Sequence, residues 1–250
     1  MWQISEIKQR AHFYMHTSYW RSVLAALVLS IVTGSVATSL IESGIEMARG
    51  LSHMDTMMFY YGMDLGMMGI SPGFFDWAVG IAFQAAIFIT IAGICISLFV
   101  MNPIEVGCER FFIVNHAMPG LARSSELFHS FGNHYLHVVK TMFLRQLYTF
   151  LWTLLFIVPG IIKHYSYRLV PYIAAEEPGM PTSEVFRLSK AMMRGNKWHT
   201  FVLDLSYIGW HILNVLTLGI LGIFYVKPYQ ATANAELYIT LRDQFLHRQS

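Results

Sequence analysis

The sequence predicts an all-α fold: a polytopic transmembrane helix bundle with six spans in three hairpins and amphipathic helices on the cytoplasmic side. Hydrophobic residues make up 55% of the 250 residues and charged residues only 13%, about half the charge of an ordinary soluble domain. Residues 23–41 and 78–101 contain no Asp, Glu, Lys or Arg. About 20 such residues, rising about 1.5 Å each, cross a ~30 Å hydrocarbon core. We therefore expect one integral membrane domain over residues 1–250.

The N-terminal segment, residues 1–21, is predicted to form a cytoplasmic amphipathic helix, because Ile4, Ile7 and Ala11 recur at helical spacing. A cleaved signal peptide is the competing interpretation of this end. The segment before the apolar core exceeds about twenty residues, whereas a signal peptide has a short charged start. We therefore expect residues 22–101 to stay as a hairpin with an outer loop at residues 42–77.

The later part of the chain contains two similar units, residues 120–176 and 182–235. A Phe, a Leu and a Trp have the same mutual spacing in both units, and both end at Pro-Tyr. Internal repetition is a recognised way to build membrane proteins, while a general enrichment of Trp, Tyr, Gly and Pro in membrane segments is the alternative explanation. The residues assigned to the motif are Pro159, Gly160, Pro171, Tyr172, Gly195, Asn196, Trp198, Trp210, Pro228 and Tyr229.

Each of these units is predicted to fold back on itself. Pro159-Gly160 is the predicted reversal between two antiparallel helices, since Pro cannot continue a helix and Gly permits a left-handed turn. The second break, Thr217-Leu218-Gly219, is a weaker signal. A single tilted helix over residues 201–225 is the alternative there, and it would move the C-terminus to the other side.

The distribution of basic residues predicts the topology. Lys and Arg gather in the N-terminal segment, in the segment after Pro103, before Trp198 and in the tail at residues 236–250. The loop at residues 42–77 has one basic residue, Arg49, and five acidic ones. Because basic loops stay inside, we expect this loop outside, both termini in the cytoplasm, and a plasma-membrane location. A four-span arrangement would export the basic segment around Arg187.

Residues 182–194 are predicted to form a helix lying on the membrane. Val185, Leu188 and Met192 fall on one face and basic residues on another. The basic residues that we expect to meet anionic lipid head groups are Arg187, Lys190 and Arg194. The alternative is that this face packs on the protein's own cytoplasmic surface.

Asp204, Arg145 and Arg168 are the charged residues most expected within the apolar belt. An ionisable group there is costly and usually faces a partner or a water-filled cavity. We therefore expect Asp204 to lie within ~4 Å of Arg145 or Arg168. A structural ion pair and a polar lining for a substrate or ion are both open interpretations.

The sequence contains no defined motif that predicts a catalytic, cofactor or metal site. The outer loop is rich in methionine, and Met54, Met57 and Met58 beside His53 are weak candidates for copper(I), although Met also fills apolar surfaces. Cys95 and Cys108 imply no disulfide framework, and no phosphate-binding loop or nucleophile elbow is present. No nucleic-acid partner is expected.

Many short segments together carry a resemblance to a known family: Asn102-Pro103, Arg110-Phe111-Phe112, Leu151-Trp152, residues 157–163, Tyr165-Ser166-Tyr167, Pro171-Tyr172-Ile173, Gly195-Asn196-Lys197-Trp198, residues 205–210 and Pro228-Tyr229. On these, nearly the whole chain resembles a bacterial membrane-protein family catalogued as domain of unknown function 975. More distantly, it is similar to the membrane domain of some glycerophosphodiester phosphodiesterases. The resemblance implies an integral membrane location and supplies no reaction or catalytic residues.

The functional hypothesis is a non-enzymatic inner-membrane protein that binds lipid or a small amphiphile, or supports a membrane complex. It rests on the basic membrane-facing helices and on the missing reaction motif. A channel or small-solute carrier is the alternative, suggested by Asp204 and the broken helices. A lipid-modifying enzyme is the third, and rests only on the distant resemblance. Self-association or a membrane-complex partner is also allowed by this hypothesis.

Overall fold

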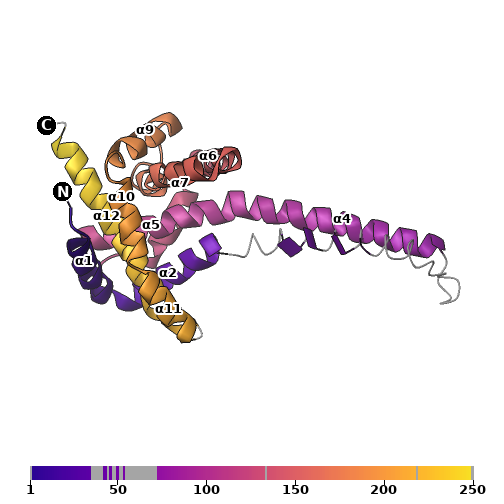
Figure 1. Ribbon diagram of the computed structural model, residues 1–250, viewed down its shortest axis with the longest axis horizontal. Helices are drawn as coiled ribbons and strands as arrows, with labels where there is room; N and C mark the ends of the chain where they lie inside the picture. Colours follow the sequence, from indigo (N-terminus) through magenta and orange to yellow (C-terminus); the bar gives the residue numbers. More distant parts are fainter. Residues whose placement is uncertain are drawn as a thin grey trace. The chain divides into compact units, whose positions relative to one another are not determined.

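The computed structural model describes residues 2–34, 72–132, 134–217 and 219–248, and residues 42, 43, 45, 46, 49, 50 and 53 between them. Within these residues every regular element is a helix, which confirms the predicted all-α class (Figure 1). The chain divides into two compact units. One combines Met1–Thr33 with Met101–Ser250, and the other is Gly34–Val100.

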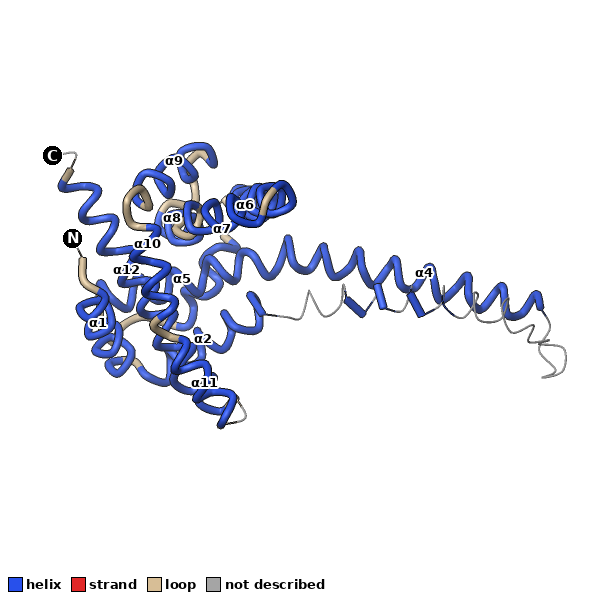
Figure 2. The backbone as a smooth tube through the Cα atoms, viewed as in Figure 1, coloured by secondary structure: helices blue, strands red, loops and turns tan. Residues whose placement is uncertain are grey.

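The larger unit contains most of the helices, and short non-helical turns join them (Figure 2). Its elements are α1 (Ile4–Thr17), most of α2 (Tyr19–Gly34), α5 (Asn102–Ala117), the 3₁₀ helix η3 (Ser124–Phe131), α6 (Tyr135–Leu155), α7 (Ile157–Ser166), α8 (Val170–Glu176), α9 (Thr182–Met192), α10 (Lys197–Leu205), α11 (Ile208–Leu216), the π-helical η4 (Gly222–Val226) and α12 (Lys227–His247). The smaller unit contains α4 (Pro72–Ile96) and most of the π-helical η2 (Ser97–Met101).

Three helices of the larger unit begin with a proline in their first turn. Pro103, Pro171 and Pro228 open α5, α8 and α12 respectively. Proline suits these positions because the first N–H groups of a helix have no partner within it and because its φ is already helical. The prolines that the sequence suggested as the ends of membrane units therefore start the three helices of the core.

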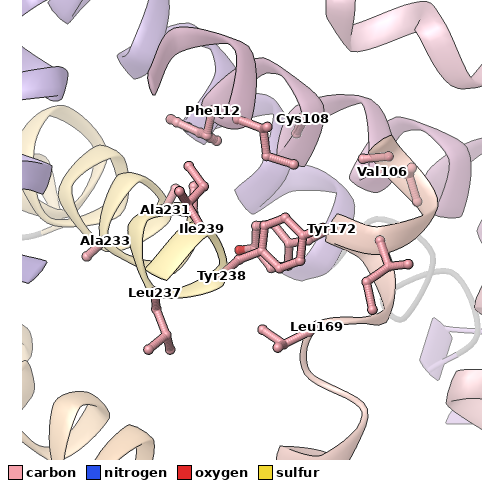
Figure 3. Close-up of a cluster of buried hydrophobic side chains, with 14 of the residues drawn as sticks. Val106, Cys108, Phe112, Leu169, Tyr172, Ala231, Ala233, Leu237, Tyr238 and Ile239 are labelled. Atoms are coloured by element: carbon pink, nitrogen blue, oxygen red, sulfur yellow. The ribbon is translucent and has the colours of Figure 1, made fainter. Parts of the chain in front are cut away.

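The hydrophobic core lies between α5, α8 and α12 (Figure 3). Tyr172 of α8 stacks on Tyr238 of α12, with ring centroids 5.3 Å apart, and Phe112 of α5 is buried in the same cluster. Helix α1 packs against α12 and buries Ile7 and Ala11. The apolar face of the predicted N-terminal helix is therefore covered by the protein itself.

Helices α6 and α7 form a hairpin whose reversal lies at Phe156, where the backbone is extended (φ −156°, ψ 138°). The reversal predicted at Pro159-Gly160 is therefore wrong by three residues, because both lie in the first turn of α7. Proline is tolerated there since its position needs no backbone donor. Gly160 is required for a different reason: a Cβ on it would lie 2.6 Å from Thr153 Cα of α6. Glycine therefore permits close packing of the two arms.

The last unit also folds back. Helix α10 ends at Leu205, α11 ends at Leu216, and Gly219 adopts a left-handed conformation (φ +87°) before η4 begins. The Gly222 N–H donates to Asn214 Oδ1 at 2.6 Å, which fastens η4 to α11. The break predicted around Thr217 to Gly219 is present, and a single helix over residues 201–225 is excluded.

The lengths of the helices bear on the predicted membrane spans. In the described part of the chain, one continuous helix, Val79–Ala117, is long and apolar enough to cross a membrane, and Tyr19–Thr33 is a shorter apolar helix. Helix α7 has 10 residues and α11 has 9, which is only about 15 Å or less per arm. Helix α6, by contrast, has 21 residues, about 31 Å, so the six predicted spans stay a prediction.

Replacing Gly160 by alanine is expected to destabilise the α6–α7 hairpin by about 1–3 kcal/mol, because the new Cβ overlaps the backbone of Thr153. The thermal unfolding midpoint of the purified protein in detergent measures the effect. Gly209→Ala is the matched control: this helical glycine has nothing within 4 Å of an added Cβ. It should be neutral or stabilise by up to about 1 kcal/mol. Equal midpoints for the two variants would contradict the close packing.

Candidate functional site

Two polar cavities flank the α6–α7 hairpin, and the register of α6 determines which residues face each. Lys140, Leu144, Tyr148 and Trp152 are spaced four residues apart and line one cavity. Arg145, Thr149 and Thr153 form a second stripe at the same spacing and line the other. Residues four apart lie on one face of a helix, so α6 separates the two cavities.

The second cavity has a volume of about 570 Å³ and is bordered by Arg168, which we take as the centre of the paired-charge cluster. Arg168 lies in the turn between α7 and α8. Its two terminal nitrogens donate to the two oxygens of Asp204 in α10, at 2.5 and 2.8 Å. The latter nitrogen also donates to Asn234 Oδ1 of α12, at 2.9 Å, and the Tyr165 hydroxyl donates to Asp204 at 2.9 Å. One guanidinium therefore joins three segments of the larger unit.

Arg145 makes a separate ion pair in the same cavity. Its guanidinium donates to Glu105 of α5 at 2.8 Å, and the neighbouring Gln146 donates to Asn102 at 2.8 Å. These two contacts fasten α6 to the first two turns of α5. Charge-assisted hydrogen bonds of this kind are stronger and more directional than neutral ones.

Glu109 is buried in the wall of this cavity, only 7% exposed. The Tyr172 hydroxyl lies against its carboxyl group, but its Oε2 atom has no hydrogen-bond partner among the described residues. The two arginines are already engaged with Asp204 and Glu105. The cluster is therefore built to join helices, with a cavity beside it large enough for a small molecule.

The structure thus brings the three charged residues singled out from the sequence to one region. Only Arg168 and Asp204 pair with each other. Asp204 lies within the expected distance of a basic group, and that group is Arg168. Arg145 pairs with Glu105 instead. Both arginine side chains are mostly buried, at 16% and 20% exposed.

The first cavity, about 760 Å³ in volume, is basic. Lys140 of α6, Lys163 of α7 and Lys190 of α9 line it together with aromatic and hydroxyl side chains, and no carboxylate is among its described lining residues. Beyond it, burial and the nearby charges of Lys163 and Arg194 lower the pKa of Lys197. We call the lining residues of this cavity the lysine pocket.

The helix predicted at residues 182–194 is α9, and its faces are as expected from the spacing. Val185 and Met192 are buried against the protein, so the apolar face packs on the chain itself. Of the three basic residues predicted to face lipid, only Lys190 lines the lysine pocket. Arg187 faces the cavity beside α8 and α12 and pairs with Glu184 at 3.5 Å, and Arg194 is exposed in the turn after α9.

The remaining candidates divide between described and undescribed residues. Met54, Met57 and Met58 lie outside the described residues, and His53 beside them is exposed. Among the residues that the structure does describe, no group of three or more His, Cys, Asp and Glu side chains is placed to hold a metal ion. Of the motif residues, Asn196 accepts a hydrogen bond from the Trp2 indole at 3.1 Å. Trp198 is 70% exposed.

Several residues of both cavities were not identified from the sequence. Glu105 and Glu109 follow Pro103 at a four-residue spacing in an otherwise apolar helix, which is the signal that could have placed both on one face. Lys163 and Lys140 are single basic residues beside apolar runs. No sequence spacing relates them to Lys190, because only the packing of α6, α7 and α9 brings them together.

We expect Asp204→Asn and Arg168→Gln to destabilise the protein more singly than the double variant does, because each single change leaves one charge without its partner. Each single change should cost on the order of 2 kcal/mol, less than for a fully buried pair, since the Asp204 side chain is 34% exposed. Unfolding midpoints in detergent for the four members of the cycle give the coupling.

A second cycle provides the control. Arg145 contacts Glu105 and not Asp204, so Arg145→Gln and Asp204→Asn should be additive within about 0.5 kcal/mol. Additivity in the Arg168 cycle, or coupling of the same size in the Arg145 cycle, would contradict the observed pairing.

Comparison with protein families identifies a match. The model of a family described as "Protein of unknown function (DUF975)" matches residues 1–244. No curated protein and no solved structure matches the chain. The match covers both cavities and every helix except the end of α12.

Proposed function

The chain belongs to this family of unknown function, DUF975, and we propose that it is a bacterial plasma-membrane protein that binds lipid or a small amphiphile without catalysing a reaction. The observation that carries the proposal is the α6–α7 hairpin, whose apolar tip is exposed while its base borders the lysine pocket. An apolar end beside a basic cavity matches the two parts of an anionic amphiphile. The proposal does not depend on any catalytic residue.

The hairpin tips support membrane insertion. The five consecutive residues at the first tip, Leu154 to Val158, are each at least 62% exposed. Val215 and Leu216 at the second tip are both 74% exposed, and Ile220 is 62% exposed. Apolar surface of this extent is unfavourable in water and is typical of protein or membrane contact. The side chains of Leu154 to Val158 also contain no polar group that would favour solvent.

The helix lengths modify the predicted topology. We keep the sides assigned from the basic residues, with both termini in the cytoplasm. In the predicted second and third hairpins, α7 and α11 are only about 15 Å long or less, against a ~30 Å core, whereas α6 has 21 residues. One arm is therefore shorter than the core in both of these hairpins. We therefore propose that they enter from the cytoplasmic side and turn inside the bilayer, while residues 22–101 supply the crossing hairpin.

Transport of a small solute or ion is the second candidate. The cavity of about 570 Å³ beside Arg168 favours it, because its wall carries Glu105, Glu109 and His164 as well as two arginines. Polar cavities between membrane helices commonly hold transported substrates. The paired arrangement of both arginines favours the non-transporting proposal, since neither is free to bind a passing ion.

Cysteine labelling tests the proposed topology in a chain whose Cys95 and Cys108 are replaced by serine. We expect His53→Cys to react with a membrane-impermeant maleimide in intact cells and Lys190→Cys to react only in inverted vesicles. Phe156→Cys at the tip should react in neither, and only after detergent is added. Alkaline carbonate should leave the protein in the membrane pellet.

Several outcomes would contradict this arrangement. Labelling of Lys190→Cys in intact cells would overturn the assigned sides. Labelling of Phe156→Cys in intact cells would show that the hairpin crosses the bilayer and would restore six spans. Release of the protein by carbonate would overturn membrane insertion itself. Retained circular dichroism of the cysteine-free background is the folding control.

A further inference from the structure

We propose that the lysine pocket binds the phosphate group of an anionic membrane phospholipid. This inference rests on the proposed function, because it names the class of lipid and the residues that hold it. The phosphate would lie among Lys140, Lys163 and Lys190, which come from three different helices. The acyl chain would lie on the apolar side of the α6–α7 hairpin.

The charge of the pocket favours an anion. Three ammonium groups line it without a carboxylate among the described lining residues, and none of the three lysines forms a salt bridge with a described residue. The nearest acidic residue of α9, Glu184, lines the opposite cavity and pairs with Arg187. An uncompensated cluster of like charges attracts anions and is stabilised by binding them.

Two lysines are held in place by aromatic rings. Lys163 Nζ lies 4.6 Å from the ring centroid of Trp152, and Lys190 Nζ lies 5.5 Å from that of Tyr167. Cation–π contacts of this length orient an ammonium group without neutralising it. Both charges therefore remain available to an anion.

The start of α9 adds hydrogen-bond donors to the same cavity. Thr182 and Ser183 occupy the first two positions of this 11-residue helix and line the pocket. Among the described residues neither backbone N–H has a partner, and no side chain caps the helix. Free N–H groups at a helix start favour phosphate, and here they supplement the lysines.

An apolar groove explains why the ligand is a lipid and not free phosphate. Leu151, Trp152, Leu154 and Leu155 line a neighbouring space of about 390 Å³ on the hairpin. Trp152 borders both this groove and the lysine pocket. A head group in the pocket therefore places its acyl chain along the leucines. Tryptophan at such a boundary is typical of the interface between head groups and hydrocarbon.

The test is a titration of the full-length protein in detergent with dioctanoyl phosphatidylglycerol, followed by tryptophan fluorescence. Trp152→Phe assigns the part of the signal that arises in the pocket. We expect Lys163→Gln and Lys190→Gln each to weaken binding about 5-fold, and Lys140→Gln/Lys163→Gln/Lys190→Gln to weaken it at least about 25-fold. Lys163→Arg keeps the charge and should bind within about 2-fold of the wild type.

Arg187→Gln is the matched control, since it removes one positive charge of α9 that lines a different cavity and pairs with Glu184. It should change the affinity less than about 2-fold. Dioctanoyl phosphatidylcholine should bind more weakly than phosphatidylglycerol, and glycerol 3-phosphate, an anionic phosphate ester without acyl chains, should bind more weakly still.

The proposal is overturned if the triple variant binds phosphatidylglycerol like the wild type, or if Arg187→Gln loses as much affinity as Lys190→Gln. Glycerol 3-phosphate binding as tightly as the lipid would overturn the lipid assignment. Carbonate extraction of the triple variant separates this site from the proposed function. A triple variant that stays in the membrane pellet but no longer binds supports the pocket, whereas release of the wild type by carbonate means that the proposed function itself has failed.

Discussion

The bidentate pair between Arg168 and Asp204 is the interaction on which the larger unit depends. Arg168 lies in the turn between α7 and α8, Asp204 lies in α10, and Asn234 of α12 accepts from the same guanidinium. A guanidinium has five donors in a fixed plane, so these partners restrict the orientation of their helices together. The turn that carries Arg168 also leads directly into α8, whose Tyr172 stacks in the core.

The α6–α7 hairpin has two chemically different sides. On one side every positive group is matched: Arg145 pairs with Glu105, and Arg168 pairs with Asp204. On the other side, Lys140, Lys163 and Lys190 share a cavity without a carboxylate among its described lining residues. Matched charges join helices to one another, whereas unmatched charges are available to a ligand. This difference is the reason for assigning a structural role to the cavity beside Arg168 and a binding role to the lysine pocket.

Proline and short helices together shape the larger unit. Pro171 opens α8 after a turn, whereas the helix that begins at Val79 continues through Pro103 to Ala117, and η4 leads directly into α12 at Pro228. The exposed apolar surface includes both hairpin tips, at Leu154 to Val158 and at Val215, Leu216 and Ile220.

The sequence by itself determined the helical class, the break near Gly219, the reversal to within a few residues, and the need of Asp204 for a basic partner. These follow from local composition and from the cost of an unpaired charge. Only the tertiary structure decided that the partner is Arg168 and not Arg145, that the reversal lies at Phe156, and that three lysines share one cavity. Pairing depends on how whole helices are rotated and packed, and that orientation is set by side chains far apart in the chain.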